Sequence, residues 1–244
     1  MELALVVGLG VAMTSIAMVG SVTLLLSEAQ FARLLTPLVA LAAGSLLGGA
    51  FWLMLPEAVR QLGNTPATWV GFVGGFVAFF LLEQLLHWHH CHRAPSHHRP
   101  VGQLILVADA LHNFIGGLTV TAVVLVDVRL GLATWAAAAL HEVPQELGDF
   151  GILVNSGWGR RRALLWNLAS GATFLVGGLL AWAVSGALDV AYLIPIAAGN
   201  FAYIGATDLL PELTTDPSLA SKATTALAFA AGLGAIAVAA ALGA

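Results

Sequence analysis

The sequence predicts an all-α integral membrane protein with eight transmembrane helices. Of its 244 residues, 59% are apolar and only 9% are charged, whereas a soluble domain has about a quarter charged residues. The mean hydropathy is +0.91. Apolar stretches of about 18 or more residues with few charges are typical of membrane-spanning helices. Such stretches lie at approximately 3–26, 35–59, 67–88, 101–126, 131–156, 161–185, 190–213 and 218–243, and we expect residues 1–244 to form a single transmembrane domain.

The basic residues predict how these spans are oriented, because Lys and Arg accumulate in cytoplasmic loops. Of the nine basic residues, only Arg60 and Arg129 lie in one set of alternate connections. The other set holds Arg33, Arg93, Arg99, Arg160, Arg161, Arg162 and Lys222. The connections after the first, third, fifth and seventh spans are therefore predicted to be cytoplasmic, with both termini outside. Short loops and the lack of long extracellular domains favour a bacterial inner membrane.

A pattern in the second span recurs in the seventh. Gly44 is followed twelve residues later by Pro56, and Gly199 is followed twelve residues later by Pro211. The spacing between the two copies is 155 residues, which also relates the first span to the sixth and the third to the eighth. Because the loop charges give the second and seventh spans opposite directions, we predict an inverted 3+2+3 repeat around the fourth and fifth spans. Secondary transporters with alternating access have this architecture, although small residues also recur by chance in membrane helices.

The two central spans carry polar side chains inside apolar sequence. Their spacings of three and four residues place them on one face of each helix. Such groups are costly in hydrocarbon and persist mainly where they face a cavity and bind something. Nitrogen and oxygen donors without thiolate suit Zn²⁺, Fe²⁺, Mn²⁺ or Co²⁺, although the amides would also serve to bond neighbouring helices. The fourth span contributes Asp109, His112, Asn113 and Gly116, and the fifth contributes His141, Glu142, Gln145, Glu146 and Asp149.

These two runs carry a family resemblance. The sequence His112-Asn113-Phe-Ile-Gly-Gly117, followed by His141-Glu142-Val-Pro-Gln145-Glu-Leu-Gly-Asp149, resembles the paired motifs of the ZIP (Zrt/Irt-like) divalent metal transporters of bacterial type. The resemblance implies eight helices with outward-facing termini and a metal site between the fourth and fifth spans. It also implies a homodimer that moves Zn²⁺ or a related cation into the cytoplasm, with the metal as substrate and no catalytic cofactor.

The resemblance also assigns the metal ligands. One subsite would use His112, His141 and Gln145, and the adjacent one would use Asn113 and Glu142. Two positions depart from the family pattern, because Gly116 stands where a carboxylate is usual and Gln145 stands where many members have histidine or a carboxylate. We therefore expect one well-occupied ion and a weak or absent second one, a prediction that anomalous scattering at the zinc edge would test.

Other polar residues are expected along the ion pathway or in metal capture. The pathway candidates outside the principal ligand set are Asp109, Glu146, Asp149, Asp208, Asn200, Glu57 and Glu212. Residues 89–100 form a cytoplasmic His-rich loop whose neutral imidazoles would chelate metal loosely; its histidines are His89, His90, His92, His97 and His98. The alternative is that this loop is dispensable.

We therefore predict a carrier that moves divalent cations, with Zn²⁺ as the expected substrate and Fe²⁺, Mn²⁺ and Cd²⁺ as further candidates, into the cytoplasm by alternating access. His141-Glu142 also begins the H-E-x-x-H motif of zinc metalloproteases, but the second histidine is replaced by Gln145, which argues against an enzyme. A metal-selective channel and a structural scaffold are the remaining alternatives. The partners are the metal ion and the lipid bilayer; with a net charge of −4 and no basic patch, a nucleic-acid partner is not expected.

Overall fold

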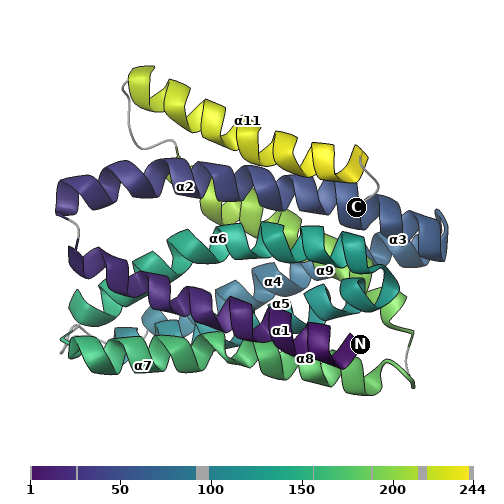
Figure 1. The fold of residues 1–244 in the computed structure, drawn as a ribbon, viewed down its shortest axis with the longest axis horizontal. Helices are drawn as coiled ribbons and strands as arrows, with labels where there is room; N and C mark the ends of the chain where they lie inside the picture. The colour runs from purple at the N-terminus through teal and green to yellow at the C-terminus, as the bar shows by residue number, and fades with distance from the viewer. Residues whose placement is uncertain are drawn as a thin grey trace.

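The computed structural model describes residues 2–25, 27–91, 99–155, 157–187, 189–213 and 219–241, and this part of the chain is all-helical (Figure 1). The described residues form eight rods, which confirms the predicted helical segments. The rods are α1 (Glu2–Ile16) with η1 (Ala17–Leu25); α2 (Glu28–Gly48), η2 (Gly49–Met54) and α3 (Leu55–Leu62); α4 (Pro66–Cys91); α5 (Arg99–Val126); α6 (Val128–Asn155); α7 (Arg160–Gly171) and α8 (Thr173–Val184); η3 (Val190–Tyr192), α9 (Leu193–Tyr203), η4 (Ile204–Leu209) and α10 (Leu210–Glu212); and α11 (Leu219–Ala241).

Five of these rods contain helices that are long and apolar enough to cross a membrane, counted over the described residues. They are Glu2–Ser21, Thr36–Leu62, Asp109–Val126, Arg160–Val184 and Lys222–Ala241. Shorter apolar helices, Pro66–Leu82 and Leu193–Thr207, represent the third and seventh predicted spans. The fifth span, α6, carries the polar run that begins at His141. The chain is a multi-pass membrane protein.

Local interactions fix where the rods begin and turn. The hydroxyl of Ser27 accepts a hydrogen bond from the backbone N–H of Gln30, and the side chain of Gln30 accepts one from the backbone N–H of Ser27. This capping box starts α2. Between α5 and α6 only Asp127 intervenes, and its carboxylate accepts a hydrogen bond from Leu130 N–H at 2.9 Å. The tight turn makes α5 and α6 antiparallel neighbours.

Glycines allow the backbones of three helix pairs to touch. A β-carbon at Gly44 would clash with the carbonyl oxygen of Phe229, which joins α2 to α11. Gly75 on α4 meets the carbonyl of Ile196 on α9 in the same way, and Gly117 on α5 meets that of Phe174 on α8. Small residues at helix contacts are the usual means of close packing in membranes.

The second and seventh spans share an irregularity of the backbone. Both contain a π-helical segment, η2 at Gly49–Met54 and η4 at Ile204–Leu209. Each begins five residues after the repeated glycine, so the two segments are separated by the same 155 residues as Gly44 and Gly199. Short π-helical segments are rare and often mark functional regions.

The rods pack as two groups. In one group α5 packs on α8 and α6, and α1 packs on α8, while η1 packs on α6. In the other, α2 packs on α11 and α4 packs on α9. The two groups meet where α2 contacts α6 and α5 contacts α9. Figure 1 shows α11 at one edge of the molecule and α7 and α8 at the opposite edge.

Candidate metal centre

Two histidines and a glutamate meet between α5 and α6. The Nε2 atoms of His112 and His141 are 2.9 Å apart. The Oε1 atom of Glu142 lies 3.2 Å from the first of these nitrogens and 3.3 Å from the second. His141 and Glu142 are each only 3% exposed. Three ligand atoms thus converge on one point inside the helix bundle, where they could hold a metal ion.

The hairpin formed by α5 and α6 explains this convergence. His112 lies fifteen residues before Asp127 and His141 lies fourteen after it. Because an α-helix rises about 1.5 Å per residue, the two imidazoles reach nearly the same depth on antiparallel helices. The predicted pairing of these two stripes is present in the structure.

Asn113 and Gln145 lie next to this centre but direct their amide nitrogens to a carboxylate. The Oδ1 atom of Asp109 accepts hydrogen bonds from Asn113 Nδ2 at 2.8 Å and from Gln145 Nε2 at 3.1 Å. The backbone carbonyl of Asp109 also accepts from Asn113 Nδ2 at 3.2 Å. In this arrangement both amides orient Asp109, but only Gln145 bonds a neighbouring helix, as the alternative for amides expects, because Asn113 and Asp109 both lie on α5.

A second group of possible ligands consists of the carboxylates of Asp109, Glu142 and Glu146. One oxygen from each lies within 4.8 Å of the others, and all three side chains are buried. Asn167 on α7 donates a hydrogen bond from Nδ2 to Glu146 Oε2. Glu142 belongs to both groups, so the two candidate sites are contiguous.

Several buried polar atoms, three of them on residues of these groups or bonded to them, have no hydrogen-bond partner among the described residues. They are Asp109 Oδ2, Thr134 Oγ1, His141 Nδ1, Asn167 Oδ1 and Asn200 Oδ1. A buried polar atom without a partner costs roughly 1–3 kcal/mol. His141 Nδ1, Asp109 Oδ2 and Asn167 Oδ1 can therefore each accept a further ligand or hydrogen bond.

The imidazoles are covered by rings from the other group of helices. Phe79 on α4 stands edge-on to His112 with ring centroids 6.3 Å apart, and Phe201 on α9 lies 6.2 Å from His141. Gly116 faces a different neighbour, because a β-carbon there would lie 3.4 Å from the ring of Phe174 on α8. The position where the family pattern has a carboxylate is thus packed against an aromatic ring.

Of the remaining predicted pathway residues, the acidic ones whose side chains the structure describes belong to neither group. Asn200 is buried on α9 at 2% exposure, while Glu57 forms a bidentate ion pair with Arg60 on α3. Asp149 is partly buried on α6 and contributes to neither metal group among the described residues. The side chains of Asp208, Glu212, His89, His90, His92, His97 and His98 lie outside the described residues.

The sequence prediction did not include Asn167 or the two phenylalanines. Asn167 is fully buried in the sixth span, and a lone amide in an apolar helix is the signal that would have found it. Nothing in the sequence distinguishes Phe79 and Phe201 from the other aromatic residues of these helices.

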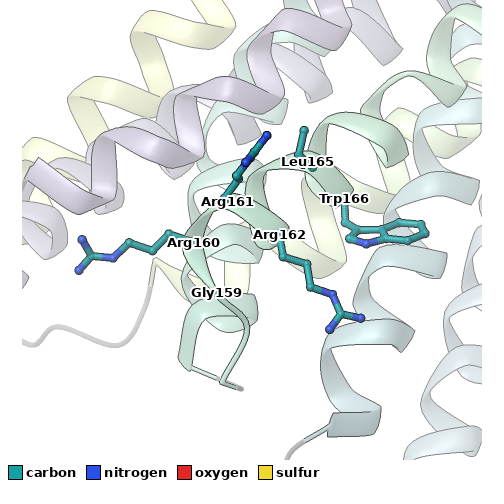
Figure 2. Close-up of a pocket in the computed structure, with 6 residues that line it drawn as sticks. All are labelled: Gly159, Arg160, Arg161, Arg162, Leu165 and Trp166. Carbon is teal, nitrogen blue, oxygen red and sulfur yellow. The ribbon is translucent and has the colours of Figure 1, made fainter.

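A surface hollow of about 500 Å³ lies at the start of α7, apart from the buried ligands (Figure 2). It is lined by Gly159, Arg160, Arg161, Arg162, Leu165 and Trp166. In Figure 2 the three arginine side chains diverge from the first turn of the helix, and the Arg162 guanidinium lies 4.2 Å from the Trp158 ring centroid. With only cationic and apolar side chains, this hollow offers no ligands for a metal cation.

Comparison with known proteins agrees with this geometry. The profile of the family described as ZIP Zinc transporter matches residues 88–240. The chain is 31% identical over 239 residues to the zinc transporter ZIP13 of Mus musculus, covering 78% of this chain and 65% of that protein. It is 43% identical over 111 residues to mouse ZIP4 and 35% identical over 124 residues to the zinc transporter foi of Drosophila melanogaster. The alignment with mouse ZIP4 covers 45% of this chain, and the alignment with foi covers 50%.

The chain spans just under two thirds of the length of ZIP13, and the matched segments cover 17% of ZIP4 and 18% of foi. The matched family is one of transporters, which confirms the prediction that the chain is not an enzyme. The buried His/Glu cluster and the helical membrane fold agree with the profile match over most of the chain's length. The chain therefore belongs to the ZIP zinc transporter family.

Proposed function

We propose that the protein carries divalent transition-metal cations across the membrane into the cytoplasm, with Zn²⁺ as its principal substrate. Fe²⁺, Mn²⁺ and Cd²⁺ are further candidate substrates. The observation that carries this proposal is the convergence of His112, His141 and Glu142 on one buried point. Imidazole nitrogen and carboxylate oxygen are the ligand types that suit Zn²⁺ and its neighbours.

Binding at this centre would replace the hydration shell of the metal. Three protein ligands leave a coordination position open for water, as in zinc sites where the ion exchanges ligands. Asn113 and Gln145 are also proposed as ligands, and either would reach the metal by rotating its amide away from Asp109. Because imidazoles and carboxylates must lose their protons to bind, metal binding would release protons into the bundle.

The eight rods are proposed to be transmembrane spans in an inverted 3+2+3 repeat. Two observations support this: the π-helical segments η2 and η4 recur after 155 residues, and the repeated Gly44 and Gly199 both lie at close backbone contacts. The contact of α2 with α11 and that of α9 with α4 are equivalent under the repeat. The start of α1 and the end of α11 also lie at one end of the bundle, and the start of α7 lies at the other (Figure 1).

Alternating access would follow from movement between the two groups of helices. Every ligand of the His112–His141–Glu142 centre comes from α5 and α6, whereas the rings that cover it, Phe79 and Phe201, come from α4 and α9. Sliding or rocking of one group against the other would uncover the metal and leave its ligands together. A structure of this kind favours a carrier over an open metal-selective channel.

The protein is proposed to be a single-domain homodimer in a bacterial inner membrane, with Asp149, Asn200 and Asp208 on the pathway. Glu57 and Glu212 would recruit and release ions at the two ends, and the histidines of residues 89–100 would capture metal at the cytoplasmic side. The seven basic residues that the sequence places in or beside the predicted cytoplasmic connections support that orientation.

Uptake of ⁶⁵Zn²⁺ into proteoliposomes tests transport itself. A carrier gives an initial rate that saturates with external Zn²⁺, and competing cations lower that rate according to their affinity for the same centre. Liposomes without protein provide the control. A rate that rises linearly with concentration over the whole range would favour a channel, and a rate equal to that of empty liposomes would contradict the proposed function.

Labelling of the only cysteine tests the orientation. Cys91, at the end of α4, is predicted to lie on the cytoplasmic side, so a membrane-impermeant maleimide should label it in inside-out vesicles only. In the matched variant Cys91→Ser/Asn64→Cys, the new thiol lies on the exposed connection between α3 and α4, and labelling should require right-side-out vesicles. The opposite pattern for both proteins would reverse the topology.

A further inference from the structure

The hollow at the start of α7 combines positive charge with exposed apolar surface. Arg160, Arg161 and Arg162 are all exposed at its wall. The apolar side chains that complete it, Leu165 and Trp166, are 55% and 53% exposed. No acidic side chain lines the hollow, and no carboxylate among the described residues forms an ion pair with these arginines. The hollow therefore holds three guanidinium charges that the described part of the chain does not neutralise.

The backbone of α7 adds donors and a positive potential at the same place. The hydrogen bond from Ala163 N–H to the Gly159 carbonyl is the first of the helix, so the N–H groups of Arg160–Arg162 have no acceptor within it. Gly159, the N-cap residue, has no side chain to accept from them. Arginines in a first turn also face the positive end of the helix dipole, which is unfavourable. An anion in the hollow would relieve this repulsion.

The arginines favour phosphate as the anion. A guanidinium is planar, and the N–H donors along its edge match two oxygens of one phosphate. Arg162 already lies with its guanidinium 4.2 Å from the ring centroid of Trp158. Stacking on a ring uses the face of a guanidinium and leaves the donors at its edge for a ligand. The indole thus limits the movement of Arg162 without neutralising its charge.

The apolar half of the hollow indicates that the phosphate belongs to a lipid. Residues four apart share a helix face, so Leu165 lies one turn beyond Arg161, and Trp166 lies one turn beyond Arg162 on the same side of α7 (Figure 2). The apolar segment that is long enough to cross a membrane begins at Arg160, so these two side chains lie deeper along it than the arginines. Free phosphate would contact only the charged half, whereas a phospholipid would contact both.

We propose that this hollow binds one anionic phospholipid. Its phosphate accepts hydrogen bonds from Arg160–Arg162 and the first backbone N–H groups of α7, and an acyl chain lies along Leu165 and Trp166. The site goes beyond metal transport, and its place in the cytoplasmic leaflet rests on the proposed orientation. The same helix carries Asn167, which donates a hydrogen bond to Glu146. The lipid is thus bound to the group of helices that carries the metal ligands.

Competition between two lipids tests the proposal. The purified full-length protein in detergent receives equal amounts of palmitoyl-oleoyl phosphatidylglycerol and phosphatidylcholine, and native mass spectrometry counts the lipids that it retains. The acyl chains of the two lipids are the same, so only the headgroup charge differs. We expect phosphatidylglycerol to be retained at least about fivefold more than phosphatidylcholine, because each arginine near an anionic headgroup adds to the attraction. An equal concentration of inorganic phosphate should not displace it.

Matched charge-removing variants locate the site. Arg161→Gln/Arg162→Gln should lower the retained phosphatidylglycerol at least about fivefold, since two of the three guanidiniums are lost. The control Arg33→Gln/Lys222→Gln also removes two exposed positive charges, on α2 and α11. Figure 1 places α11 at the opposite edge of the molecule from α7, so the control should retain phosphatidylglycerol within about twofold of the parent.

Three results would each overturn the lipid site. They are equal retention of the two lipids by the parent, equal losses in the hollow variant and the control, and displacement of phosphatidylglycerol by inorganic phosphate. If the hollow variant does not give the parent's size-exclusion profile, Leu165→Asp replaces it, because a carboxylate there should repel the same phosphate and acyl chain. No arm of the test measures Zn²⁺, so failure of the lipid site and failure of the proposed transport are separate results.

Discussion

Replacing His141 by alanine should remove most Zn²⁺ uptake while leaving the protein folded. The imidazole supplies one of the three converging ligand atoms, and its ring is 3% exposed. Even changes to groups that only orient metal ligands lower metal affinity or activity by about 10–100-fold. Loss of a direct ligand should therefore lower Zn²⁺ affinity by at least about tenfold. The initial rate of ⁶⁵Zn²⁺ uptake into proteoliposomes, at Zn²⁺ concentrations below saturation, measures this loss.

His112→Ala provides the matched variant, because the Nε2 atom of His112 lies 2.9 Å from that of His141 in the proposed metal centre. The two substitutions should reduce uptake to a similar extent, and the double variant should be little worse than either one, since residues that act as a unit are strongly non-additive. Uptake by monodisperse His141→Ala protein at the parental rate would contradict the assignment of this residue as a ligand.

The second large effect concerns stability at the contact between α4 and α9. A β-carbon at Gly75 would clash with the carbonyl oxygen of Ile196, whereas one at the adjacent Gly74 meets nothing within 4 Å. Gly75→Ala should therefore destabilise the protein by about 1–3 kcal/mol, the usual cost of overpacking. The measurement is the temperature at which half of the detergent-solubilised protein loses its monodisperse peak.

Gly74→Ala is the control for this change. Both substitutions replace glycine by alanine in the same helix, so their intrinsic gain in helix propensity is the same. The control should be neutral or slightly stabilising, and only Gly75→Ala should lower the transition temperature. Equal transitions for the two variants would mean that α4 and α9 do not approach as closely as the structure shows.

Hydrophobic length and hairpin geometry made much of the fold predictable. Over the residues that the structure describes, each of the eight predicted segments is helical, because long apolar stretches in a membrane satisfy their backbone polar groups internally. The pairing of His112 with His141 could be predicted because both lie on the polar faces of neighbouring spans and at nearly equal distances from the turn at Asp127.

Other features depend on interactions that the periodicity of a sequence does not encode. The rotation of the Gln145 amide onto Asp109 depends on a contact across two helices, and the resemblance had suggested a metal ligand instead. Asn167 reaches Glu146 only because α7 packs beside α6. The π-helical segments η2 and η4 shift backbone hydrogen bonds by one residue, and apolar sequence of ordinary composition does not reveal such a shift.

Crystals soaked with Zn²⁺ and measured at the zinc absorption edge test most directly whether the two helices share one ion. The structure predicts a principal anomalous peak within bonding distance, about 2.0–2.1 Å, of the Nε2 atoms of both His112 and His141, with Glu142 as a further ligand. A principal peak that contacts neither ring, or imidazoles that lie apart on separate faces of α5 and α6, would contradict the proposed metal centre.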